Sequence, residues 1–135
     1  MSTYTTIEAI HPKLKDDKQS RAKCRTQSDC PYIEILTTFT DNVIFINWAV
    51  KHGEGNYSDA FLSEEQFLQL YEDIKQTLEF IQQKFNLKLD DFKKDQGSNC
   101  DLFHMYRFYT EFDKLKRKFK KAKQKGLTLI CIHLW

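Results

Sequence analysis

The chain has 135 residues, 41% of them hydrophobic and 30% charged, with a formal net charge of +2. This length fits one domain, and this composition excludes a disordered or collagen-like protein. No apolar run approaches the roughly 20 residues that span a bilayer, and the start of the sequence lacks the pattern of a secretory signal. We therefore expect a single domain over residues 1–135 in the cytoplasm, without contact with a membrane and with its four cysteines reduced.

The first part of the chain predicts a strand, a loop and a hairpin. Tyr4, Ile7 and Ile10 favour a short strand within the first ten residues. Residues 11–31 are polar, contain six Lys or Arg against three Asp, and show no sustained period, so we expect an exposed basic loop. Two apolar runs follow in residues 32–50. They alternate at period two around a turn at Asp41-Asn42, which predicts a β-hairpin.

The second part predicts two long helices and a strand. Ser63 and Gln66 have the spacing of a capping box, and apolar residues at steps of three and four continue to Phe85, so we predict a helix over 63–85. A matching stripe predicts a second helix over 98–125, ended by Gly126. Residues 127–135 are apolar on both faces of an alternating pattern, which is typical of a strand inside a sheet.

These elements predict an α+β fold. We expect a small, mostly antiparallel sheet, covered on one face by an antiparallel pair of long helices. The C-terminal strand should return to that sheet.

The clearest functional signal is the cationic second helix. With its apolar stripe turned inward, cations cover most of the remaining circumference, and Asp113 is the only local acid. We expect Lys116, Arg117, Lys120, Lys121 and Lys123 to bind an acidic protein surface or a nucleic-acid backbone. The alternative is neutralisation within the chain, because the first helix is acidic. The cations are Lys114, Lys116, Arg117, Lys118, Lys120, Lys121, Lys123 and Lys125.

Metal binding and catalysis have little support in the sequence, and we expect no cofactor. The weak candidate for a zinc site combines Cys24, Cys30, Cys100 and His104. Its spacing is not that of compact zinc modules, so reduced cysteines are the simpler interpretation; in an oxidising compartment Cys24 and Cys30 would instead close a disulfide loop. Sequence motifs of known catalytic sites are absent.

We therefore expect a small non-enzymatic binding protein that docks its basic helix onto an acidic macromolecular surface. An accessory subunit or inhibitor of a nucleic-acid-handling machine is the most concrete form of this hypothesis. One alternative is a protein–protein module of immunity or inhibitor type that uses an aromatic face near Tyr57, Tyr106 or Tyr109. Another is a small enzyme with a site near His52 and Glu54. Aromatic residues beyond the main stripe of the second helix also make a homo-oligomer as reasonable as a monomer.

Overall fold

The computed structural model describes residues 4–40, 42–94 and 101–135. The centre of the fold is a five-stranded antiparallel sheet in the order β2-β1-β5-β4-β3. The C-terminal strand β5 pairs with β1 on one side and β4 on the other, which confirms the predicted return to the sheet. The strands are β1 (Tyr4–Ile10), β2 (Ile33–Thr40), β3 (Glu54–Gly55), β4 (Asp59–Leu62) and β5 (Leu129–Leu134).

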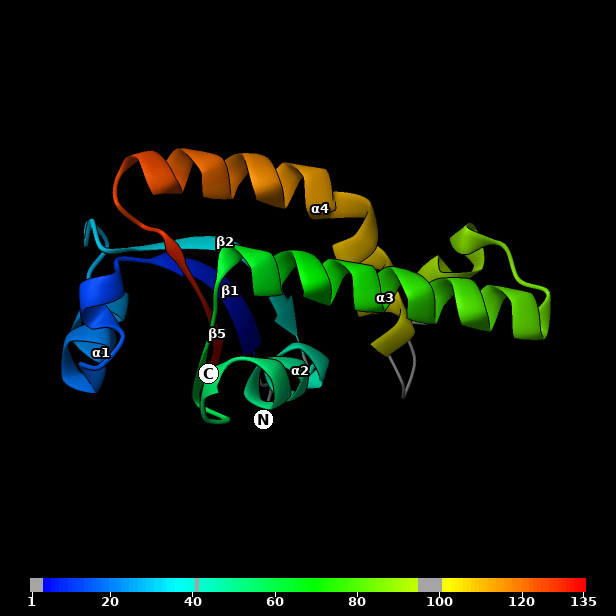
Figure 1. The fold of residues 1–135 in the computed structure, drawn as a ribbon, viewed down its shortest axis with the longest axis horizontal. Coiled ribbons are helices and arrows are strands. Elements are labelled where there is room, and N and C mark those ends of the chain that lie inside the picture. Colours follow the sequence, from blue (N-terminus) through cyan, green and yellow to red (C-terminus); the bar gives the residue numbers. More distant parts are fainter. Residues whose placement is uncertain (1–3, 41, 95–100) are drawn as a thin grey trace.

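Two long helices, α3 (Glu64–Phe85) and α4 (Asp101–Gln124), lie side by side and run in opposite directions (Figure 1). The last turns of α3 project beyond the sheet. The predicted α+β fold with an antiparallel helix pair is therefore confirmed. The α3 start is the predicted capping box, in which the Ser63 and Gln66 side chains each accept a hydrogen bond from the other residue's backbone N–H. Residues 98–100 of the second predicted helix lie outside the described residues.

The two faces of the sheet carry different side chains because neighbouring residues of a strand point to opposite sides. Ile7, Ala60 and Ile132 face the long helices and belong to the main core, together with the aromatic rings of Phe67, Phe108, Phe112 and Phe119. Glu8, Asp59 and Cys131 point to the opposite face and are buried there. The second face therefore buries charged side chains as well as apolar ones.

The predicted basic loop over 11–31 is wrong in part, because it contains helix α1 (Lys18–Thr26) and the 3-10 turn η1 (Pro12–Leu14). Asp17 caps α1, and its carboxylate accepts hydrogen bonds from the backbone N–H and the hydroxyl of Ser20. These two bonds lower the pKa of Asp17 from its ordinary value. The spacing of apolar residues does not predict this helix, because α1 contacts the sheet largely through Arg21 and Arg25 and has no apolar stripe.

The predicted hairpin over 32–50 is also wrong in its second half. Residues 33–40 form strand β2, but the following apolar run is helix α2 (Ile44–His52). The Asn42 side chain accepts a hydrogen bond from the Ile44 N–H at 2.7 Å and so supports the helix start. A run that is apolar on all sides fits a buried strand and a buried helix equally well by pattern. Packing decides between them here, because α2 lies against β3, β4 and β5.

A second 3-10 turn, η2 (Leu89–Lys94), connects the long helices. None of the described helices has both the length and the apolar character needed to cross a bilayer.

Replacing Ser63 with Ala should lower the free energy of unfolding by about 1 kcal/mol, because the Gln66 N–H loses its side-chain acceptor at the start of α3. The measurement is urea unfolding followed by circular dichroism. The matched control is Gln83→Ala, an exposed substitution on the same helix, which should change the value by less than about 0.5 kcal/mol. Equal effects of the two substitutions would contradict the assigned role of the cap.

Candidate functional site

The cations of residues 107–125, apart from Lys120, fall into three groups according to what they contact. The first group faces the sheet. Lys118 Nζ donates to the Leu36 carbonyl at 3.1 Å, and Arg107 Nη1 donates to the Thr38 carbonyl at 2.8 Å. Because β2 is an edge strand, its outer carbonyls would otherwise be available to another chain. These two cations therefore protect the edge of the sheet and are not available for a partner.

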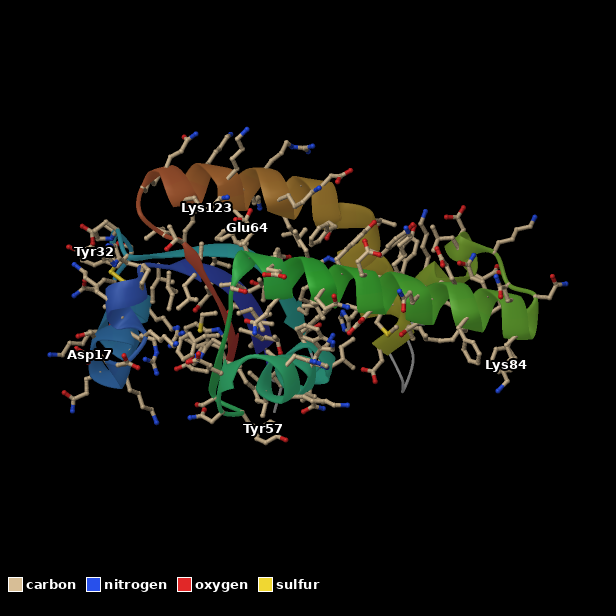
Figure 2. All side chains as sticks on the ribbon, viewed as in Figure 1. Asp17, Tyr32, Tyr57, Glu64, Lys84 and Lys123 are labelled. Atoms are coloured by element: carbon tan, nitrogen blue, oxygen red, sulfur yellow. A yellow bond between two sulfur atoms is a disulfide. The ribbon has the colours of Figure 1, made fainter. Side chains whose placement is uncertain are left out.

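The second group lies close to carboxylates. Lys123 Nζ lies 2.9 Å from both carboxylate oxygens of Glu64 at the start of α3 (Figure 2). Lys116 Nζ is 3.7 Å from Asp113, and Lys125 Nζ is 3.7 Å from Glu34. Two of the five predicted binding residues, Lys116 and Lys123, thus already have an acidic neighbour in their own chain.

The third group consists of Lys114, Arg117 and Lys121, which we call the outer ridge of α4. Their spacing of three and four residues places them on one face of the helix, over about 10 Å at 1.5 Å per residue. All three are exposed, and among the described residues none of them takes part in an ion pair. Figure 2 shows long side chains with nitrogen ends projecting from α4 on the side away from α3. The predicted cationic surface is therefore narrower than the sequence suggests.

A groove between α3 and α4 adjoins this ridge. Its volume is about 230 Å³, and three of the predicted binding residues, Lys116, Lys120 and Lys123, line it. Phe119 and the exposed Leu68 form apolar parts of its wall. Lys120, like the outer ridge, has no ion pair within the described part of the chain. Glu64, which pairs with Lys123, also lines the groove, so the groove combines apolar wall with charges of both signs.

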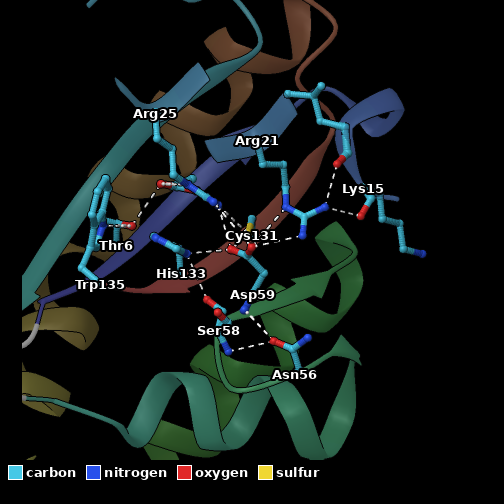
Figure 3. A network of polar contacts seen from close by, with 12 residues as sticks. Thr6, Lys15, Arg21, Arg25, Asn56, Ser58, Asp59, Cys131, His133 and Trp135 are labelled. Atoms are coloured by element: carbon cyan, nitrogen blue, oxygen red, sulfur yellow. Dashed lines mark hydrogen bonds and ion pairs between the residues drawn. The ribbon is translucent and has the colours of Figure 1, made fainter. Parts of the chain in front are cut away.

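A second site, which we did not predict from the sequence, is an ionic network buried on the α1 face of the sheet (Figure 3). Arg25 of α1 donates through Nη2 to Glu8 Oε1 and to Asp59 Oδ1, each at 2.8 Å. Arg21 Nη2 lies 3.1 Å from Asp59 Oδ2. The Glu8 side chain is completely buried, and those of Asp59, Arg25 and Arg21 are each less than a tenth exposed.

His133 and Cys131 of β5 complete this network. His133 Nδ1 lies 2.7 Å from Asp59 Oδ1 and 3.0 Å from the Ser58 carbonyl, and since both are acceptors, Nδ1 carries the proton. Burial acts to raise the pKa of Asp59, but the His133 hydrogen bond and the Arg25 charge outweigh it and hold that pKa well below its usual range. Burial, together with the charges of Glu8 and Asp59, raises the pKa of the Cys131 thiol well above its ordinary value. Cys131 is therefore a protonated, unreactive thiol.

The signals for this network were present but scattered through the sequence. Arg21 and Arg25 have the i, i+4 spacing of one helix face, in a segment that lacks apolar period. Glu8 and Asp59 each stand in an otherwise uncharged strand. Only the pairing of β1, β5 and β4 brings these carboxylates together.

The weak zinc candidate is not supported. Cys24 and Cys30 are joined by a disulfide, so neither offers a thiolate, and the expectation that both are reduced is wrong. Cys100 lies outside the described residues, and His104 is buried on α4 with its ring edge-on to Phe39. Within the described ranges, no group of three or more His, Cys, Asp or Glu side chains is placed to hold a metal ion.

The two residues of the predicted enzyme site, His52 and Glu54, each contact a different neighbour. His52 stacks on Trp48 with ring centroids 4.2 Å apart, beside a pocket of about 500 Å³ that Asp73 and Phe80 also line. Glu54 instead forms an ion pair with Lys15. Of the predicted aromatic anchors, Tyr57 is exposed, whereas Tyr106 and Tyr109 are partly buried against the core.

Comparison of the chain with models of known protein families, with curated proteins and with solved structures found no match.

Replacing Asp59 with Asn should lower the free energy of unfolding by about 3–5 kcal/mol, because Arg21 and Arg25 would lose a shared buried counter-charge. Thermal and urea unfolding measure the change. The control is Asp16→Asn, an exposed substitution just before α1, for which we expect less than about 0.5 kcal/mol. A loss below about 1 kcal/mol for Asp59→Asn would contradict the importance of the network.

The same carboxylate should make stability depend on pH. Because the pKa of Asp59 is depressed in the folded state, its contribution is fully present above the unfolded-state value of about 3.9 and is lost as the pH falls toward the folded-state value. The unfolding free energy of the wild type should therefore drop below about pH 4 more steeply than that of Asp59→Asn. Unfolding in urea at a series of pH values tests this, and parallel curves for the two proteins would rule it out.

Proposed function

We propose that this protein is a small non-enzymatic binding protein that docks α4 onto an acidic macromolecular surface. The observation that carries the proposal is the outer ridge, Lys114, Arg117 and Lys121, whose charges have no counter-ion in the described part of the chain. Like charges at this spacing repel one another, so an acidic partner relieves repulsion as well as adding attraction.

The ridge supports the proposal better than the full set of eight cations does. Lys118 and Lys125 contact the edge strand, and Lys123 contacts Glu64, so their charges serve the fold. Arg117, Lys120 and Lys121 remain from the predicted binding set, and Lys114 joins them. Docking through these four residues leaves the contacts between α4 and the sheet intact.

An acidic protein patch fits this ridge better than a nucleic-acid duplex does. The neighbouring helix α3 presents the exposed carboxylates Glu65, Glu72 and Glu79, so a duplex wide enough to cover both helices would meet charges of both signs. A protein patch can match the width of the ridge and can place an apolar side chain in the groove between the helices. An inhibitor or accessory subunit of a nucleic-acid-handling machine remains the most concrete form of this function.

Two related expectations stay predictions. Self-association is compatible with the exposure of Phe80 and Phe85, which are 62% and 61% accessible on the projecting part of α3. The cytoplasmic location also stays a prediction. The Cys24–Cys30 disulfide argues against it, because disulfides are rare in reducing compartments.

The triple substitution Lys114→Glu, Arg117→Glu and Lys121→Glu should abolish binding of acidic probes without unfolding the protein, because the three side chains are exposed. The probes are a labelled oligo-glutamate peptide, a short single-stranded DNA and a short DNA duplex, measured by fluorescence anisotropy. If three phosphates are neutralised on the duplex, log K should fall with log salt with a slope of about −2.7.

The control variant reverses Lys75, Lys84 and Lys88, three cations outside α4, and should bind as the wild type does. Tighter binding of the peptide than of either DNA supports the protein partner, and the reverse order supports a nucleic-acid backbone. Failure of all three probes to bind the wild type at low salt, or equal binding by the triple variant, would refute the proposed function.

A further inference from the structure

The ionic network opens into a pocket that the proposed function does not use. This pocket, which we call the Trp135 pocket, has a volume of about 430 Å³, within the range of small-molecule sites. Glu8 and Arg25 are its buried charged residues. Ile35 of β2 and Trp135 supply apolar wall, and the Cys24–Cys30 disulfide lies beside them.

The wall of the pocket is both exposed and rigidly held. Ile35 is 53% exposed and Trp135 is 50% exposed, so both present apolar surface to water. Yet the Trp135 backbone N–H donates to the Tyr4 carbonyl at 2.8 Å, and its indole N–H donates to Thr6 Oγ1 at 3.1 Å (Figure 3). An aromatic ring that is fixed in place before binding loses little conformational entropy when a ligand stacks on it.

The charges of the pocket favour a neutral ligand. Arg25 already donates to Glu8 and Asp59, so an anion would compete with two buried carboxylates for one guanidinium. A cation would find the Glu8 carboxylate occupied by Arg25 and Thr6, and Glu34 close to Lys125. A charged ligand would therefore lose its hydration and would have to compete with an existing ion pair to gain a counter-ion.

The polar groups that remain available are neutral. Gln27 and Ser28, in the loop that the disulfide closes, are exposed and line the pocket. An amide and a hydroxyl each donate and accept hydrogen bonds, so they match a ligand edge that has a donor beside an acceptor.

From this geometry we infer that the Trp135 pocket is a binding site for an uncharged, planar heteroaromatic molecule. The ring stacks on the Trp135 indole and contacts Ile35, while its hydrogen-bonding edge faces Gln27 and Ser28. The site lies on the α1 face of the sheet and uses none of the α4 ridge, so it is independent of the proposed macromolecular docking.

The test compares three small molecules of similar size and different charge: nicotinamide (neutral), nicotinate (anionic) and benzamidine (cationic). Uracil and adenosine are added as further neutral planar probes. Indole N–H resonances of the ¹⁵N-labelled protein report binding, and Trp48, which lines the separate pocket beside His52 and donates to Asp73, shows whether the probes select the Trp135 pocket. The two resonances are assigned with a Trp48→Phe variant.

We expect a saturable shift of the Trp135 indole with neutral probes, with a Kd on the order of millimolar for a ligand of about nine non-hydrogen atoms. Nicotinate and benzamidine should bind about tenfold more weakly or not at all, because their charge finds no partner. The Trp48 resonance should stay in place.

A matched pair of variants locates the site. Ile35→Glu, at an exposed wall position, should abolish the shift of Trp135, whereas Val43→Glu, at an exposed position before α2, should leave it unchanged. No saturable shift at Trp135 with any neutral probe would overturn the inference. Equal affinity for the charged analogues, or unchanged binding by Ile35→Glu, would overturn it as well.

Discussion

The structure depends on the neutralisation of two carboxylates that the sheet buries on its α1 face. Glu8 and Asp59 come from β1 and β4, which are separated in the sheet by β5, and Arg25 contacts both of them. An uncompensated carboxylate in such a place is strongly destabilising, whereas the ion pair itself is often no more stabilising than an apolar replacement. The network therefore matters less as a source of stability than as a constraint, because it requires α1 to lie in one position on the sheet.

This constraint shapes the region around Trp135. With α1 held by Arg21 and Arg25, its C-terminal end and the following disulfide loop stand beside β2 and the end of β5. The result is the Trp135 pocket. The charges of Glu8 and Arg25 in it neutralise each other, and Ile35 and Trp135 expose apolar surface on its wall. The same ion pairs that hold the helix thus determine which ligand charge the pocket tolerates.

On the opposite face of the sheet, the cations of one helix have several different roles. There α4 covers an apolar core with one side, protects the β2 edge with a second and presents cations with a third. One lysine-rich segment therefore has structural and exposed cations interleaved along it, and composition cannot separate them. Lys118 and Lys121 illustrate the point: three residues apart, one donates to a strand carbonyl and the other faces solvent.

The elements that could be predicted are those whose period or capping is local. The α3 start at Ser63, the apolar stripes of α3 and α4, and the all-apolar β5 could be predicted because a helix or a strand imposes its repeat on neighbouring residues. Tertiary contacts were needed to establish helices α1 and α2. The all-apolar pattern of residues 44–52 fits a strand as well as a helix, and the polar segment around Arg21 is held on the sheet by its charges. The tertiary structure also brings Glu8 and Asp59 to Arg25, and these contacts, between residues 17 and 34 positions apart, leave no local period in the sequence.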